Sequence, residues 1–254
     1  MKLINDDCLN AMKDIADKSI DLILTDLPYN TVKNKTVCKW DSPIDLDKLW
    51  IEYKRIMKDD ATAVLFAQQP FTSKLILSNI DMYKYNWIWM KQEATNFLNS
   101  HYQPMKITED VCVFSNLPSS YVKTGSMRYN PQMEEGDPYC TKSGNRKKAS
   151  SVVRSNLSSI SKQNSGERFP LNIIYFPRDN DKFHPTQKPV DLLRYFIRTY
   201  TNEGDIVLDS CMGSGSTGVA CVKENRDFIG IEKDIEYGYF DIAKKRINEA
   251  LQKK

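Results

Sequence analysis

Short apolar runs alternate with helical segments along most of the 254 residues. The apolar runs are 2–5, 21–26, 61–68, 85–91, 109–115, 171–176, 204–209 and 227–232. Helical spacing of apolar residues predicts helices over 6–15, 45–57, 71–80, 184–201 (entered through Pro189), 216–225 and 234–254. Strands that alternate with helices in this way predict an α/β fold, with a mostly parallel sheet and helices on both of its faces.

One segment interrupts this alternation. Residues 117–170 are rich in Ser, Asn, Gly and Lys and contain only very short apolar runs. Loops longer than about 15 residues are usually functional or disordered. We therefore predict one domain made of residues 1–116 and 171–254, with 117–170 as an insertion that carries recognition.

The charge of the chain is concentrated in this insertion. Residues 121–170 contain nine basic and four acidic residues, a net +5, which leaves −2 for the rest of a chain whose total is +3. A localised positive excess is typical of a surface that binds a polyanion. A solvated, partly disordered insertion would have the same composition, so both interpretations stay open at this point.

Composition excludes several classes of protein. Hydrophobic residues make up 41% and charged residues 27%, as in soluble globular proteins, and no run approaches the roughly 20 apolar residues of a membrane span. The first residues contain acids where an export signal would be apolar. Six scattered cysteines without a CxxC pair, and only two histidines, argue against a zinc site and for a reducing cytoplasm, and we expect no metal.

A glycine-rich turn near the end of the chain indicates a nucleotide cofactor. The predicted strand 204–209 ends in Asp209. The loop that follows contains Gly213, Gly215 and Gly218, which match G-x-G-x-x-G. The next predicted strand ends in Glu232. A carboxylate in the position of Glu232 can accept hydrogen bonds from both ribose hydroxyls. Asp209 would repel the pyrophosphate of NAD, whereas it would attract a sulfonium with an α-amino group. The pattern favours S-adenosylmethionine over NAD, and a cofactor over a purely structural turn.

The stretch TDLPYN ends the strand 21–26 with groups that suit an exocyclic amine. Asp26 and the carbonyl of Leu27 can accept the two N–H donors, Pro28 stiffens the turn, and the ring of Tyr29 can stack on a base. The alternative for the tetrapeptide alone is a turn with an aromatic cap.

Three motifs together resemble those of amino-group DNA methyltransferases. Asp26-Leu27-Pro28-Tyr29 resembles the Asp-Pro-Pro-Tyr signature, 209–218 resembles the cofactor loop, and HPTQKP at 184–189 is similar to a further motif. Their order is that of the β subclass, in which the catalytic half precedes the cofactor half. Other stretches, such as NDDCLNAM and VLFAQQPFTSKLILSN, resemble phage-type and orphan members. The resemblance covers most of 1–140 and 170–245.

This resemblance implies a fold, a reaction and partners. It implies a Rossmann-like S-adenosylmethionine-dependent methyltransferase fold with permuted motif order, and 117–170 as its target-recognition region. The substrate would be double-stranded DNA, whose adenine is flipped out and methylated on N6. The alternatives are an N4-cytosine methyltransferase and a catalytically dead nucleic-acid-binding protein. The resemblance also implies a homodimer, as in many β-subclass relatives, and a place in restriction–modification.

Residue by residue, the resemblance assigns roles. The catalytic residues are Asp26, Leu27, Pro28 and Tyr29. The cofactor-binding residues are Asp7 (adenine), Glu232 (ribose), Asp209, Gly213, Ser214 and Gly215 (methionine), with Thr186, Gln187 and Lys188 closing the methionine side. His184 is expected to be a structural loop histidine. The chain departs from the family pattern at Leu27, usually proline, and at Cys211, usually phenylalanine.

Two basic groups are predicted to contact DNA phosphates. Lys33, Lys35 and Lys39 lie in the loop after Tyr29, which we interpret as a mobile lid. Arg146, Lys147 and Lys148 form the densest basic run of the insertion.

Overall fold

The structure is a computed structural model that describes residues 1–254 except 30–40, 121–122, 124, 141–162, 182 and 235. The chain separates into two compact units. One consists of Met1–Asn130 and Asn172–Lys254, and the other of Pro131–Leu171.

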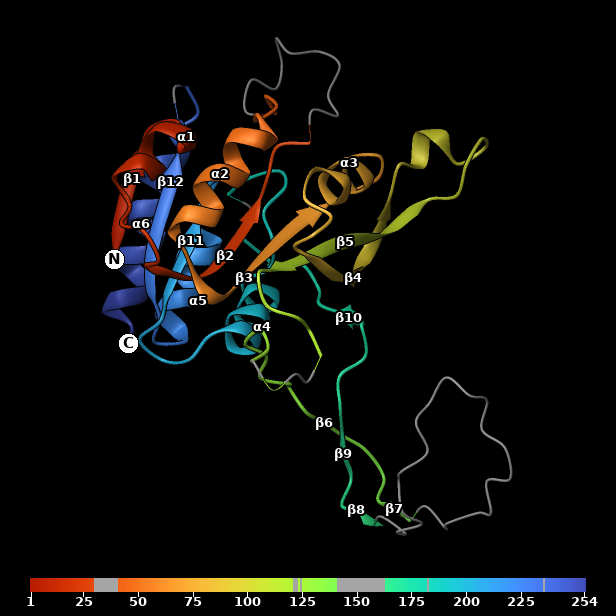
Figure 1. The fold of residues 1–254 in the computed structure, drawn as a ribbon. Helices are drawn as coiled ribbons and strands as arrows, with labels where there is room; N and C mark the ends of the chain where they lie inside the picture. The colour runs from red at the N-terminus through yellow and green to blue at the C-terminus, as the bar shows by residue number, and fades with distance from the viewer. Residues whose placement is uncertain (30–40, 121–122, 124, 141–162, 182, 235) are drawn as a thin grey trace. The chain divides into compact units, whose positions relative to one another are not determined.

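The first unit is built on a single sheet (Figure 1). Among the described residues, eight strands lie in the order β1-β12-β11-β2-β3-β5-β4-β10. Their bounds are β1 Lys2–Asn5, β2 Ile20–Asp26, β3 Met57–Ala67, β4 Tyr83–Thr95, β5 Lys106–Ser115, β10 Ile173–Tyr175, β11 Ile206–Asp209 and β12 Asp227–Glu232. Every neighbouring pair is parallel except the two that β5 makes, with β3 and with β4. The predicted mostly parallel sheet is confirmed.

Helices cover both faces of this sheet, also as predicted. The helices α1 Cys8–Ala11, α2 Leu46–Ile56 and α3 Phe71–Ser78 pack into one hydrophobic core, and α4 Val190–Tyr200, α5 Ser216–Lys223 and α6 Tyr239–Gln252 into the other. Two short 3₁₀ turns, η1 Met12–Asp14 and η2 Phe97–Asn99, accompany them. Strand β2 shows why its sequence is a continuous apolar run: Ile23 enters the first core, while Leu22 and Leu24 enter the second.

The central pair of strands places the site. Strand β2 continues through α2 to β3 on one side, whereas β11 continues through α5 to β12 on the other side. The order of strands therefore reverses between β2 and β11. Ligands of open α/β sheets bind outside the carboxyl ends of the strands at such a point.

The last helix begins later than its sequence predicts. The predicted helix 234–254 is α6, which starts at Tyr239. The carboxylate of Asp234 accepts hydrogen bonds from the backbone N–H groups of Tyr237, Gly238 and Phe240, and Gly238 has φ of +69°. The chain therefore turns tightly before the helix, because the Asp234 side chain competes for N–H groups at this end.

The second unit contains short antiparallel pairs in its described part. Strand β6 Glu134–Glu135 pairs with β9 Glu167–Arg168, and β7 Tyr139–Cys140 pairs with β8 Gln163–Asn164. The guanidinium of Arg168 lies 4.5 Å from the ring centroid of Tyr139. This cation–π contact links the two pairs.

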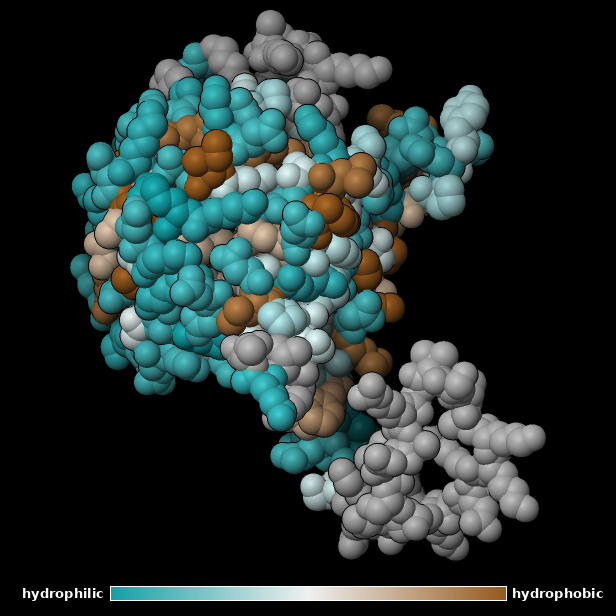
Figure 2. All heavy atoms as spheres, viewed as in Figure 1, coloured by the Kyte–Doolittle hydropathy of each residue, from teal (hydrophilic) through white to brown (hydrophobic). Residues whose placement is uncertain are grey.

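Hydrophilic side chains cover most of the face shown in Figure 2, with apolar patches between them. None of the helices in the described parts of the chain is long and apolar enough to cross a membrane.

At the amino ends of the central strands, Arg128 joins three carboxylates. Its guanidinium pairs with Asp205, with Asp60 at 2.8 Å and with Asp21 at 3.5 Å. The side chain of Asp21 is 1% exposed and also pairs with Lys58 at 2.8 Å. Arg128 therefore fixes the last part of the segment before 131 to β2, β3 and the turn that precedes β11.

Arg128→Ala should lower the free energy of unfolding by about 1–3 kcal/mol, because it leaves partly buried carboxylates with fewer partners. Urea denaturation measures this difference. Lys18→Ala, which removes an exposed ion pair with Asp59, is the matched control and should cost at most about 1 kcal/mol. Equal losses in the two variants would contradict a structural role for Arg128.

Candidate active site

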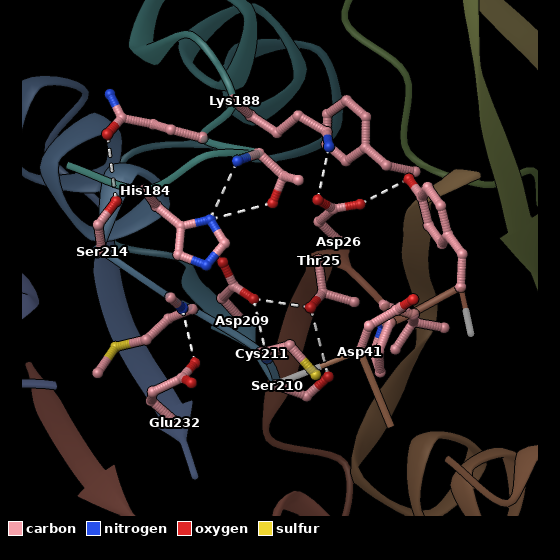
Figure 3. Close-up of a pocket in the computed structure, with 18 of the residues that line it drawn as sticks. Thr25, Asp26, Asp41, His184, Lys188, Asp209, Ser210, Cys211, Ser214 and Glu232 are labelled. Atoms are coloured by element: carbon pink, nitrogen blue, oxygen red, sulfur yellow. Dashed lines mark hydrogen bonds and ion pairs between the residues drawn. The ribbon is translucent and has the colours of Figure 1, made fainter. Parts of the chain in front are cut away.

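A cavity of about 1030 Å³ lies at the carboxyl ends of the central strands in the first unit (Figure 3). Most of the residues that were predicted for the site line it. They are Asp7, Asp26, Leu27, Pro28, Tyr29, Thr186, Gln187, Lys188, Asp209, Gly213, Ser214 and Glu232. Cys211, where the family usually has phenylalanine, also lines the cavity.

Gly215, which was also predicted to bind the cofactor, is not among the described residues that line the cavity. It has φ of +80°, and a Cβ atom built on it would lie 2.7 Å from the Cβ of Ala243 in α6. The residue is a glycine because α6 packs against its backbone. Gly213 differs, since a Cβ there would meet no atom within 4 Å.

The carboxylate of Asp209 holds the glycine loop from within. Its Oδ1 accepts hydrogen bonds from the Thr25 hydroxyl at 2.7 Å and from the Cys211 N–H at 3.1 Å, and its Oδ2 accepts one from the Thr217 hydroxyl at 2.6 Å. Burial raises the pKa of Asp209 to about 6, although these hydrogen bonds oppose the rise. The Asp209 side chain is 4% exposed. Through these three hydrogen bonds it organises the end of the cavity nearest to the loop.

Glu232 stands at the tip of β12 on the same side of the cavity (Figure 3). Its Oε2 accepts a hydrogen bond from the Gly213 N–H at 2.7 Å. Burial raises the pKa of Glu232 to about 7, and the hydrogen bond from Gly213 opposes this. Asp7 caps the N-terminus of α1 and pairs with Lys233 at 3.1 Å. These side chains offer acceptor oxygens to a ligand that carries hydroxyl groups.

Asp26 occupies the tip of β2, further along the cavity. Its Oδ1 accepts a hydrogen bond from the Tyr29 hydroxyl at 2.6 Å, and its Oδ2 accepts one from the Lys188 ammonium at 2.5 Å. Burial raises the pKa of Asp26, while Lys188 opposes the rise. The ring of Tyr29 stacks on Phe71, with centroids 5.2 Å apart and an interplanar angle of 26°.

The HPTQKP segment contacts both the tip of β2 and the glycine loop. Lys188 was predicted to close the methionine side, but its ammonium lies against Asp26. Burial alone would lower the pKa of Lys188, yet Asp26 and Glu109 raise it above its usual value, so the side chain stays charged. Gln187 instead accepts a hydrogen bond from the Ser214 hydroxyl at 3.3 Å, which joins the segment to the glycine loop. Thr186 also lines the cavity.

His184 contacts protein groups, as expected for a structural histidine. Its Nδ1 accepts a hydrogen bond from the Thr186 N–H at 3.2 Å, and its ring packs edge-on against Tyr239 with centroids 4.3 Å apart. Burial and the charge of Lys188 lower the pKa of His184 to about 4, so the ring is neutral near pH 7.

Glu109 and Lys91 are two charged residues of the cavity lining that sequence reasoning did not predict. Glu109 lies in β5 and pairs with Lys188 at 3.0 Å and with Lys91 at 2.5 Å. The signal was an acid at the start of a strand. This signal points to the site only if β5 is known to run antiparallel to β3. The amino half of an antiparallel strand lies at the same edge of the sheet as the carboxyl ends of the parallel strands.

The predicted phosphate-binding residues Lys33, Lys35, Lys39, Arg146, Lys147 and Lys148 lie outside the described residues.

Comparisons with known proteins give one consistent result. The model of a protein family described as DNA methylase matches residues 20–245. The type II methyltransferase M.HpaI of Haemophilus parainfluenzae is 28% identical, over 97% of this chain and 74% of that protein. The DNA adenine methyltransferase YhdJ of Escherichia coli (strain K12) is 28% identical, over 92% of this chain and 79% of that protein.

Solved structures share the fold. The M1.HpyAVI–SAM complex superposes with a TM-score of 0.62 at 24% identity, over 97% of this chain and 98% of that one. The cytosine-N4-specific PvuII DNA methyltransferase superposes with a TM-score of 0.62 at 16% identity, over 99% of this chain and 93% of that one. The predicted Rossmann-like methyltransferase fold is confirmed.

Glu232→Gln should make the ligand-free protein more stable at pH 8. The pKa of Glu232 in the folded state, about 7, lies above its ordinary value of 4.5. Its contribution to stability is therefore present below about pH 4.5 and is lost as the pH rises through 7. Glutamine stays neutral and keeps an acceptor oxygen for Gly213, so the variant should gain on the order of 1–3 kcal/mol at pH 8.

Urea denaturation at pH 8 and pH 5 checks this, because the gain should shrink at the lower pH. Glu203→Gln replaces an exposed carboxylate and is the matched control, with an expected change within about 0.5 kcal/mol. A Glu232→Gln protein no more stable than wild type at pH 8 would show that the charged form of Glu232 is not penalised by burial.

Proposed function

This chain belongs to the DNA methylase family, and on that premise we propose that it transfers a methyl group from S-adenosylmethionine to N6 of a flipped-out adenine in double-stranded DNA. The observation that carries the proposal is that Asp26, Gly213 of the glycine loop and Glu232 at the end of β12 all line one cavity. Methyl transfer requires the amine and the donor in one enclosed space, with the reacting atoms aligned.

The residues around the glycine loop fit S-adenosylmethionine. When bound, it supplies an electrophilic methyl group on a sulfonium. The Glu232 carboxylate would accept hydrogen bonds from the ribose hydroxyls, because its raised pKa reflects a poorly solvated group in need of donors. Gly213 leaves open space beside its backbone, so a ligand can approach closely. Ser214, Gln187 and Thr186 would contact the methionine part, and Asp7 would approach the adenine.

The residues around Asp26 fit the amine of a base. A carboxylate oxygen has lone pairs beyond those used by Tyr29 and Lys188, and the Leu27 carbonyl supplies a second acceptor. Hydrogen bonds from the amine to these oxygens would draw its lone pair out of conjugation and direct it at the methyl group. Phe71 braces one face of the Tyr29 ring, and the base would stack on the ring from the cavity side. Positioning and electrostatics then supply most of the rate.

Adenine is the proposed base because Asp26 is an aspartate. Relatives that act on cytosine N4 commonly have serine in this position, and the E. coli relative is a DNA adenine methyltransferase. Transfer of a radiolabelled methyl group to DNA, digestion to nucleosides and chromatography test the proposal. Label in N4-methyldeoxycytidine and none in N6-methyldeoxyadenosine would overturn it.

The basic segment 117–170 is the proposed target-recognition region. The lysines of the loop after Tyr29 are the proposed contacts to DNA phosphates. The net +5 of residues 121–170 supports this, since neutralising phosphates supplies much of the affinity for DNA. The homodimer stays a prediction from the resemblance.

Asp26→Ala should lower the single-turnover rate of methyl transfer by about 100-fold or more, because it removes a preorganised acceptor for the target amine. Calorimetry should show nearly unchanged affinity for S-adenosylmethionine, since the carboxylate faces the other part of the cavity and Lys188 keeps its partner Glu109. Asp59→Ala, at an exposed position, is the control. A folded Asp26→Ala protein that no longer binds S-adenosylmethionine would show that the Asp26 end of the cavity does not serve the target amine alone.

Replacing Arg146, Lys147 and Lys148 together with glutamine should weaken DNA binding. It should also lower the slope of log K against log salt by about 0.9 for each DNA phosphate that these side chains neutralise in the wild-type complex. Fluorescence anisotropy over a series of salt concentrations would measure both quantities. An unchanged slope would assign this run to a solvated loop, whereas a weaker sequence preference at constant slope would place the residues on base edges.

A further inference from the structure

A buried carboxylate, Glu109, lies beside Asp26 on a strand that none of the sequence motifs includes. Glu109 belongs to β5 and stands opposite Trp89 of β4 in the register. Its side chain is 6% exposed. It faces the core between the sheet and α4, to which Trp89 and Phe66 also belong.

Glu109 contacts both groups that hold Asp26, of which Figure 3 shows Lys188. Its Oε1 lies 3.0 Å from the Lys188 ammonium and accepts a hydrogen bond from the Tyr29 hydroxyl at 3.0 Å. Its Oε2 lies 2.5 Å from the Lys91 ammonium. Lys188 is thus shared between two carboxylates, at 2.5 Å from Asp26 and 3.0 Å from Glu109.

The four charges alternate in sign along a chain of contacts. Lys91, Glu109, Lys188 and Asp26 follow one another, each within ion-pair distance of the next. Burial of such groups is unfavourable, and well-packed apolar residues are often at least as stabilising as a buried ion pair. A pair formed by Lys188 and Asp26 alone would already be neutral in charge. The extra pair formed by Glu109 and Lys91 therefore calls for a role other than stability.

On the basis of the function proposed above, we propose that Glu109 is a positioning residue for methyl transfer. By sharing Lys188 with Asp26, it prevents the ammonium from binding Asp26 alone, and it holds the Tyr29 hydroxyl beside the same carboxylate. Asp26 thereby stays a strong acceptor for the target amine. Glu109 acts through these two neighbours and does not touch the substrate.

The charge of Glu109 also acts on the ionisation of Asp26. The groups that face Asp26 are Lys188 before α4, Tyr29 after β2, Glu109 on β5 and Asp209 on β11. Burial raises the pKa of Asp26, Lys188 lowers it, and the negative charge of Glu109 raises it again. Removing that charge should therefore lower the pKa of Asp26, and within the described part of the chain it leaves Lys188 with Asp26 as its remaining carboxylate partner.

Glu109→Gln tests the proposal because it keeps the size and one acceptor oxygen and removes only the charge. Single-turnover rates of DNA methylation, with the donor and DNA both saturating, should fall by about ten-fold or more on the high-pH plateau. The acid limb of the pH profile should shift to lower pH. Glu109 lines the cavity, but the proposal gives it no direct contact with either ligand. The dissociation constants of S-adenosylmethionine and DNA should therefore change by less than about two-fold. Glu109→Asp keeps the charge and should keep the acid limb of the wild type.

A double variant separates positioning from mere charge balance. If Glu109 only neutralises Lys91, Glu109→Gln combined with Lys91→Met should recover the rate of wild type, whereas positioning of Lys188 predicts no recovery. Recovery, or a Glu109→Gln enzyme with the wild-type plateau and acid limb, would overturn the inference. If Glu109→Gln does not fold, the Glu109→Asp variant decides: an acid limb shifted from that of wild type would overturn the inference. Failure of the proposed function is distinct, because wild type itself would then transfer no methyl group to DNA.

Discussion

The rest of the site depends on the hydrogen bonds that the carboxylate of Asp209 accepts. Its hydrogen bond with Thr25 joins residues 184 positions apart in the sequence, and its hydrogen bonds with Thr217 and the Cys211 N–H fix the glycine loop to the start of α5. A buried carboxylate is tolerated only when it is fully hydrogen-bonded. The strand that carries Asp26 and the loop that carries Gly213 are therefore held at a defined separation before any ligand binds.

The two parts of the cavity use partly buried acids in different ways. Burial raises the pKa of Glu232 to about 7, so a ligand with hydroxyl groups would improve its surroundings. Asp26 lies in a set of two carboxylates and two ammonium groups with Lys188, Glu109 and Lys91, so its ion-pair partners are in place without a ligand. One part of the site is thus completed by what it binds, whereas the other is preorganised by the protein.

The sequence predicted most of the fold, because apolar periodicity reports directly on burial. The continuous run of β2 and the helical spacing of α2 both follow from which faces are covered. Motif residues such as Asp26 and Glu232 were predicted for the site because they end strands. Strand ends meet at one edge of the sheet, and both residues line the cavity there. Glu109 and the true orientation of Lys188 were missed, since both depend on an antiparallel strand and on contacts between segments far apart in the sequence. The shift of α6 was missed because Asp234 competes locally for N–H groups.

The place of β11 in the middle of the sheet has a consequence for synthesis of the chain. A ribosome produces β2, β3, β4 and β5 first, and these neighbours can pair while the chain grows. One edge of β2 then has no partner, and β1 lacks its neighbour β12, until β11 and β12 emerge in the last quarter of the chain. An apolar strand with an open edge is prone to pair with other chains. The growing chain therefore carries open edges on β1 and β2 until β11 and β12 are made, and the cavity at the ends of these strands can form only then.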